Sequence, residues 1–87
     1  MFTVYAIISE STDKIYIGQT IDLVVRLEQH NNVEKHLSQF TSQNKGPWKL
    51  IYKEEYKTRG EALKREKQLK SYRGREFIRN LIKNNRP

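Results

Sequence analysis

The chain has 87 residues, of which 36% are hydrophobic, and this is enough for one small domain with a modest core, which we expect to span residues 1–87. It contains no cysteine, which excludes a disulfide framework and a zinc site built on thiolates. No run of about 18 apolar residues occurs, and no basic region precedes the apolar N-terminus, so we expect a cytoplasmic protein that neither spans a membrane nor is exported.

The formal net charge of +7 comes from the second half of the chain. Residues 1–44 contain three Lys or Arg and five Asp or Glu, whereas residues 45–87 contain fourteen and five. The basic stretch from Lys64 to Arg86 is typical of a chain that binds a polyanion, most often nucleic acid, with an anionic membrane surface or an acidic protein as alternatives. A solvated helix face explains the charge about equally well.

The first elements predicted along the chain are two strands of a β-hairpin. Residues 2–9 alternate between two faces and are rich in β-branched and aromatic side chains. Turn-forming residues follow, and residues 14–18 then form a second strand with Gly18 at its exit. A four-residue loop between the strands would place Tyr5 directly opposite Tyr16, on the same face of the sheet.

A helix follows the second strand directly. Asp22 is a plausible N-cap, and the helix is expected to reach His30 or Asn31. Its spacing predicts that Leu23, Leu27 and Val24 are the buried positions.

The remaining chain predicts a loop, a strand and two helices. Residues 32–47 show no clear period and form the loop, with a short turn near residues 37–40. Alternation returns in residues 48–56, and helices are expected over residues 60–72 and 75–85, with Gly74 as the break between them. The order ββαβαα predicts an α+β fold, a three-stranded antiparallel sheet flanked by helices.

Four side chains of the first half could carry chemistry. Tyr5 and Tyr16 lie on the less apolar faces of their strands, and Arg26 and His30 are neighbours on one face of the helix that follows. Convergence of these groups would create a site for a phosphate. Each of them also has a common structural role, since tyrosines are frequent in strands and an isolated Arg or His is usually solvated or paired.

Glu66 lies beside the apolar positions of its helix, with Ala62, Leu63 and Leu69 as neighbours. A carboxylate in such surroundings needs a cation, because burying an unpaired charge costs several kcal/mol. The cation is either Arg or Lys in a structural ion pair, favoured by the many basic residues nearby, or a divalent metal in a site.

These residues resemble the GIY-YIG nuclease superfamily. Thr3-Val4-Tyr5, ten intervening residues and Tyr16-Ile17-Gly18 look like its paired signature, and Arg26 follows ten residues after Tyr16, as the catalytic arginine of the family does. His30 lies one turn further on, and the segment EALKREKQLK resembles the helix that carries the metal-binding glutamate, here Glu66. The resemblance spans nearly the whole chain. Residues 46–56 and 69–82 also resemble small stand-alone members related to the nuclease module of the bacterial excision-repair incision subunit.

The resemblance implies a DNA endonuclease that needs one Mg²⁺ or Mn²⁺ held by Glu66 and that serves DNA repair or recombination near the nucleoid. Arg26 would bind the phosphoryl oxygens, and one of the two tyrosines would orient or deprotonate the attacking water, with His30 as a possible helper. The basic helices would bind DNA through Lys64, Lys67, Lys70, Arg73 and Arg75. A nucleic-acid-binding module without catalysis and a protein-interaction adaptor are the alternatives on the same fold.

Three positions depart from the family pattern. Thr3 replaces the first glycine of the signature, and Gln19 stands where some members have a lysine. The asparagine that completes the site in several members has no clear counterpart, and Asn80 is a candidate for it.

Overall fold

The computed structural model describes residues 1–31 and 47–84 of the chain. Its elements, in chain order, are β1 (Phe2–Ser9), β2 (Ile15–Thr20), α1 (Leu23–Asn31), β3 (Trp48–Tyr56), α3 (Arg59–Lys70) and α4 (Tyr72–Asn84). The strands form one antiparallel sheet in the order β2-β1-β3. The predicted α+β fold with the order ββαβαα is therefore confirmed. The loop expected over residues 32–47, with its turn near 37–40, lies outside the described residues apart from Pro47.

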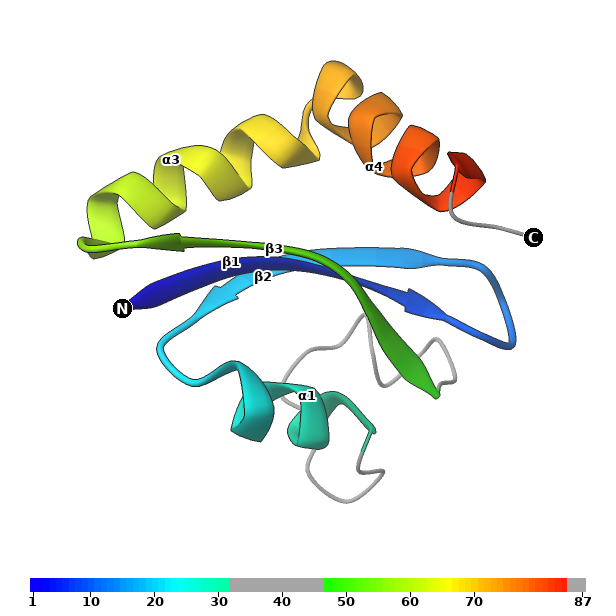
Figure 1. Ribbon diagram of the computed structural model, residues 1–87, viewed down its shortest axis with the longest axis horizontal. Coiled ribbons are helices and arrows are strands. Elements are labelled where there is room, and N and C mark those ends of the chain that lie inside the picture. The colour runs from blue at the N-terminus through cyan, green and yellow to red at the C-terminus, as the bar shows by residue number, and fades with distance from the viewer. Residues whose placement is uncertain (32–46, 85–87) are drawn as a thin grey trace.

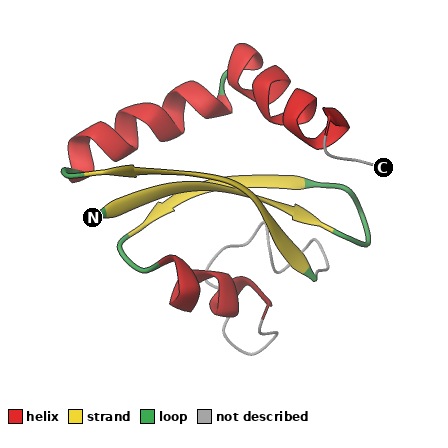
Figure 2. Ribbon diagram, viewed as in Figure 1, coloured by secondary structure: helices red, strands yellow, loops and turns green. Residues whose placement is uncertain are grey.

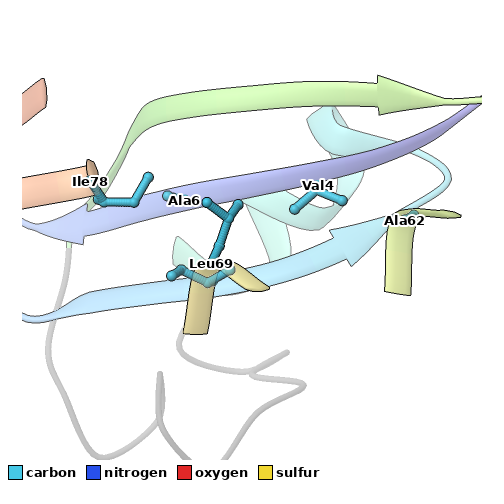
Figure 3. Packing of buried hydrophobic residues seen from close by; sticks show 6 residues of the cluster. Val4, Ala6, Ala62, Leu69 and Ile78 are labelled. Atoms are coloured by element: carbon cyan, nitrogen blue, oxygen red, sulfur yellow. The ribbon is translucent and has the colours of Figure 1, made fainter. Parts of the chain in front are cut away.

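The sheet is the middle one of three layers, with α1 on one face and α3 and α4 on the other (Figures 1 and 2). The central strand β1 is therefore covered on both faces, and its two rows of side chains enter different clusters. The first cluster, under α3 and α4, contains Val4, Ala6, Ile17, Ala62, Leu69 and Ile78 (Figure 3). The second, under α1, contains Tyr5, Ile7 and Trp48, with Tyr16, Leu23, Leu27 and Leu50 packed against it.

The hairpin register differs from the predicted one. Tyr5 pairs with Gly18, and Tyr16 pairs with Ile7, so the prediction that Tyr5 lies directly opposite Tyr16 is wrong. The turn is displaced by one residue, since the backbone N–H of Ser9 donates to the Lys14 carbonyl (2.9 Å). Ser9 also caps the turn, accepting hydrogen bonds from the backbone N–H of Asp13 (2.9 Å) and Thr12 (3.2 Å).

Asp13, the last residue of the turn, takes up a left-handed conformation with φ of 61°. Aspartate tolerates this region better than most residues because its short polar side chain bonds locally. The register moves by two residues, and side chains alternate with a period of two, so Tyr5 and Tyr16 keep the predicted common face.

Helix α1 begins and ends where the sequence predicts. The carboxylate of Asp22 accepts a hydrogen bond from the backbone N–H of Val25 (3.2 Å), which caps the helix. At the other end, the side-chain amide of Asn31 bonds both backbone groups of Trp48, donating to its carbonyl (3.1 Å) and accepting from its N–H (2.6 Å). This pair fixes the end of α1 to the start of β3. The expected burial of Val24 is wrong, since its side chain points away from the sheet and is 69% exposed.

The sequence predicts a break between the C-terminal helices at Gly74, but in the structure the break lies at Ser71. The Ser71 hydroxyl donates to the carbonyl of Gln68 (2.5 Å), and α4 starts at the next residue. Gly74 lies inside α4, where a Cβ would come within 2.3 Å of the Gln68 carbonyl oxygen and of the Leu69 Cα. Glycine is therefore needed because the first turn of α4 lies against the last turn of α3.

A polar cluster holds α3 to the outer strand β3. Glu54 accepts hydrogen bonds from the hydroxyls of Tyr52 (2.5 Å) and Tyr56 and from Nε of Arg65 (2.9 Å). Burial acts to raise the pKa of the Glu54 carboxyl, but these three donors outweigh it and hold the pKa below its ordinary value. The carboxylate is therefore ionised at neutral pH and links β3 to α3.

Candidate active site

Three aromatic rings meet between the sheet and α1. The ring centroids of Tyr5 and Tyr16 are 6.2 Å apart, and those of Tyr16 and His30 are 4.8 Å apart. Tyr5 comes from the central strand, Tyr16 from the edge strand β2 and His30 from the last turn of α1. The prediction that the two tyrosines face the same side of the sheet is confirmed.

Hydrogen bonds join this aromatic group to Arg26. The hydroxyl oxygen of Tyr5 lies 2.7 Å from Nε2 of His30, and it accepts a hydrogen bond from Nε of Arg26 (3.3 Å). Because a guanidinium can only donate, the phenolic proton is left for His30, and this assigns Nε2 as its acceptor. Tyr5 therefore connects the two helix side chains that the sequence placed one turn apart.

Burial raises the pKa of Tyr5 to about 12, although the hydrogen bond from Arg26 acts in the opposite direction. The phenol consequently keeps its proton at neutral pH. For Arg26, burial acts to lower the pKa, but hydrogen bonding to Tyr5 and Tyr16 outweighs it, and the net shift is upward. The guanidinium is a permanent cation held in place by the two phenols.

Exposure separates the roles of the two tyrosines. Tyr5 is 0% exposed and His30 is 1% exposed, so neither can touch a substrate in this conformation. Tyr16 is half-buried, and its ring lies on the α1 face of the sheet. Its neighbours in β2, Ile15 and Ile17, face a cleft of about 600 Å³ on the α3 and α4 side that opens to solvent. Tyr16 and Arg26, also half-buried, are thus the members of the group that a ligand can reach.

Gly18, the last residue of the YIG triplet, makes this arrangement possible. A Cβ at this position would lie 2.9 Å from the Tyr5 hydroxyl oxygen and 3.0 Å from Cε1 of Tyr16. These distances are shorter than side chains tolerate, so only glycine lets the two phenols approach across β2.

Glu66 lies on α3, across the sheet from α1. Its hydrogen bond in the described part of the chain is to Lys70 and not to the aromatic group or Arg26. Its Oε2 accepts from the ammonium of Lys70 at 3.0 Å, and the Glu66 side chain is 20% exposed. The expected cation for this carboxylate is therefore present as an i,i+4 ion pair. Its charge nevertheless contributes to raising the pKa of Tyr5, which puts the carboxylate within electrostatic range of the phenol.

Metal binding depends on how many ligating side chains lie together. Within residues 1–31 and 47–84, no three His, Cys, Asp or Glu side chains gather into a metal-binding group. Mg²⁺ often needs only one or two carboxylates, with waters and substrate phosphates as its other ligands. A single accessible carboxylate such as Glu66 fits that mode of binding.

The three positions that depart from the family pattern have different surroundings. Thr3 is buried within β1, paired with Thr20 and Glu55, so the backbone accommodates a β-branched residue there. The Gln19 side-chain oxygen is buried without a hydrogen-bond partner in the described part of the chain. Asn80 is exposed on α4 and does not line the cleft.

The cleft beside Tyr16 is formed by the hairpin tip, β2 and the corner between α3 and α4. Its basic residues are Lys14, Lys70, Arg75 and Arg79. Of the nucleic-acid-binding residues expected from the sequence, Lys70 and Arg75 line the cleft, whereas Lys64, Lys67 and Arg73 are exposed elsewhere on these helices. Lys14 and Arg79 were missed, because only the folded chain brings the hairpin tip to α4. No helix in the described ranges has the length and apolar character needed to cross a membrane.

Comparison with known proteins agrees with this geometry. The sequence model described as "GIY-YIG catalytic domain" matches residues 1–80. The chain is 36% identical over 77 residues to UPF0213 proteins of Staphylococcus aureus strains Mu3 and Mu50, which covers 88% of this chain and 89% of each relative. No solved structure matches the chain. This protein belongs to the GIY-YIG family, whose catalytic domain is of the nuclease type.

Proposed function

We propose that this protein is a divalent-metal-dependent endonuclease that hydrolyses phosphodiester bonds in DNA. The observation that carries the proposal is the hydrogen-bonded group of Tyr5, Arg26 and His30, which packs against the half-buried Tyr16. A fixed cation and a reachable phenol beside a basic cleft suit a phosphate ester that gains negative charge during hydrolysis.

Arg26 is proposed to bind the oxygens of the scissile phosphate. Its Nε is engaged by the Tyr5 hydroxyl, so the orientation of the guanidinium plane is set before substrate arrives. Bound in this way, the terminal nitrogens can bond the phosphoryl oxygens more strongly as charge develops in the transition state. Tyr5 and His30 act through Arg26 as positioning residues.

Tyr16 is proposed to contact the attacking water, because it is half-buried whereas Tyr5 is fully buried. It would orient the water and accept a hydrogen bond from it. Glu66 would hold the single Mg²⁺ or Mn²⁺ ion, whose chemistry is to polarise the phosphate and lower the pKa of a bound water. Lys70, which pairs with Glu66 and lines the basic cleft on the α3 and α4 side, would then exchange this partner for a DNA phosphate.

The biological setting we propose is DNA repair or recombination in the cytoplasm, close to the nucleoid where the substrate lies. The test is incubation with supercoiled, single-stranded, flap and branched DNA, with Mg²⁺ or Mn²⁺ and a chelator control. Cleavage that the chelator abolishes, and that Arg26→Ala lowers on the order of 10²-fold or more, is expected. DNA binding without cleavage of any substrate would leave a binding module, and salt-insensitive DNA binding would favour a protein-interaction adaptor.

A further inference from the structure

The cleft beside Tyr16 has a composition that the catalytic group alone does not explain. Four of its lining residues are basic and one, Asp13, is acidic. The basic ones come from three separate places in the chain, the hairpin tip, the end of α3 and the first half of α4. A charge that accumulates from distant segments in one concave site marks an anion-binding surface more strongly than a basic run along one exposed helix does.

The corner between α3 and α4 creates this arrangement. Ser71 ends α3, and the close approach allowed at Gly74 turns α4 back over the edge of the sheet. Arg75 and Arg79 are one turn apart on α4 and therefore lie on one face, on the same side of the corner as Lys70.

The hairpin tip forms the opposite wall. Lys14 is held by the turn, since its backbone N–H donates to the Thr12 hydroxyl (3.3 Å) and its carbonyl accepts from Ser9 (2.9 Å). Between the walls lies β2, which is the edge strand of the described sheet, so its outer backbone groups face the cleft. Backbone N–H groups of this kind add hydrogen-bond donors for phosphate oxygens.

The basic side chains can exchange their present partners for a ligand. Arg79 pairs with Glu76 at 3.3 Å, and their side chains are 62% and 44% exposed. Exposed ion pairs contribute little to stability, so moving Arg79 to a phosphate costs little. Lys14 and Arg75 are both exposed.

From these features we infer that the cleft binds the phosphodiester backbone of DNA on the α3 and α4 side of the sheet, with Lys14 and Arg79 as phosphate contacts on its two walls. The inference rests on the proposed nuclease function, which supplies DNA as the ligand. The cleft lies across β2 from the catalytic group, of which only Tyr16 borders it.

The experiment compares two double variants that remove the same charge. Lys14→Gln with Arg79→Gln acts on the cleft, and Lys49→Gln with Lys53→Gln removes two exposed lysines from β3, the far edge of the sheet. Affinity for short fluorescein-labelled DNA, both single-stranded and annealed, is measured by anisotropy in chelator across a salt series. Melting temperatures check that both proteins are folded.

The cleft variant is expected to bind at least one form of DNA about tenfold more weakly, with the log–log salt slope reduced by about 2, while the β3 variant binds like wild type. Equal losses in the two variants, or no loss in the cleft variant with either form, would overturn the inference. Cleavage by the wild-type protein is measured separately. If only the cleft variant loses DNA affinity and the wild type cleaves no DNA, the nuclease function is refuted and the binding site stands. If the wild type cleaves DNA but the cleft variant keeps its affinity, the nuclease function stands and the binding site is refuted.

Discussion

The hydroxyl oxygen of Tyr5 lies 2.7 Å from Nε2 of His30 in a part of the protein that solvent does not reach. This contact joins the central strand to the last turn of α1, and Arg26 shares the same hydroxyl. The site is therefore organised around a buried phenol that a substrate does not touch.

The first prediction concerns that hydroxyl. Tyr5→Phe keeps the ring and its packing but removes the group that orients Arg26 and bonds His30. We expect a folded protein whose rate of cleavage at saturating DNA falls by about 10²-fold, because the guanidinium loses its fixed orientation. A single-turnover assay gives this rate, and an unchanged KM with a lowered kcat would separate positioning from DNA binding. Wild-type rates in the folded variant would contradict the role assigned to Tyr5.

A second prediction follows from the raised pKa of Tyr5, about 12 against an ordinary value of 10.0. The folded protein holds the phenolic proton more tightly than the unfolded chain does. The resulting stabilisation is complete below pH 10 and is lost as the pH rises from about 10 to about 12, up to about 2–3 kcal/mol. Urea denaturation at about pH 9 and about pH 11.5 should show a smaller loss of stability for Tyr5→Phe than for wild type. Identical losses in the two proteins would contradict the raised pKa, since the other tyrosines are common to both.

Gly18 provides a third prediction, with Gly60 as its matched control. A methyl group at Gly18 would lie 2.9 Å from the Tyr5 hydroxyl oxygen, whereas one at Gly60 would meet nothing within 4 Å. Gly18→Ala should therefore displace the phenol from Arg26. Cleavage should fall tenfold or more, because the free energy lost is about that of one hydrogen bond to a charged group. Gly60→Ala should keep full activity and gain some stability, up to about 1 kcal/mol, from its helical position. Equal activities in the two variants would show that the approach of the phenols across Gly18 does not matter.

Glu66→Gln tests the metal-ligand role directly. The carboxylate is only partly buried and its ion pair with Lys70 is of the i,i+4 type, so the loss of stability should be about 0.5 kcal/mol or less. Divalent-metal binding, followed by titration calorimetry with Mn²⁺, should collapse together with cleavage. Glu76→Gln is the control, because it removes the comparable ion pair with Arg79 and should leave metal binding and cleavage intact. A Glu66→Gln protein that is destabilised but fully active would reduce Glu66 to a structural residue.

The last prediction separates stability from function in the Glu54 cluster. Glu54→Gln takes the charged acceptor away from two tyrosine hydroxyls and Arg65, and we expect a loss of about 1–3 kcal/mol at neutral pH with unchanged cleavage by the folded fraction. Since the pKa of Glu54 is lowered in the folded state, its contribution is present above pH 4.5 and is lost as the pH falls through the folded pKa. The difference in melting temperature from wild type should therefore shrink in acid. Glu55→Gln, an exposed neighbour on β3, should show no such difference at either pH.

Local patterns in the sequence determined the elements of this protein and most of its boundaries. Alternation in β1 and β3 and the Asp22 cap predicted the observed strands and the first helix, because these signals act over a few neighbouring residues. The common face of Tyr5 and Tyr16 was also determined, since a register change of two residues preserves the side of every side chain. The family signature added the candidate site, and the family match over residues 1–80 supports the resemblance.

Contacts between distant segments decided the rest. The capping of the turn by Ser9 set the hairpin register, and the close packing at Gly74 moved the helix break to Ser71, neither of which a local pattern reveals. Only the folded sheet buries Tyr5 while leaving Tyr16 half-exposed, and only the α3–α4 corner brings Arg79 to the same cleft as Lys14. Burial and convergence depend on which surfaces pack together, so the tertiary structure alone determines which of the predicted residues a substrate can reach.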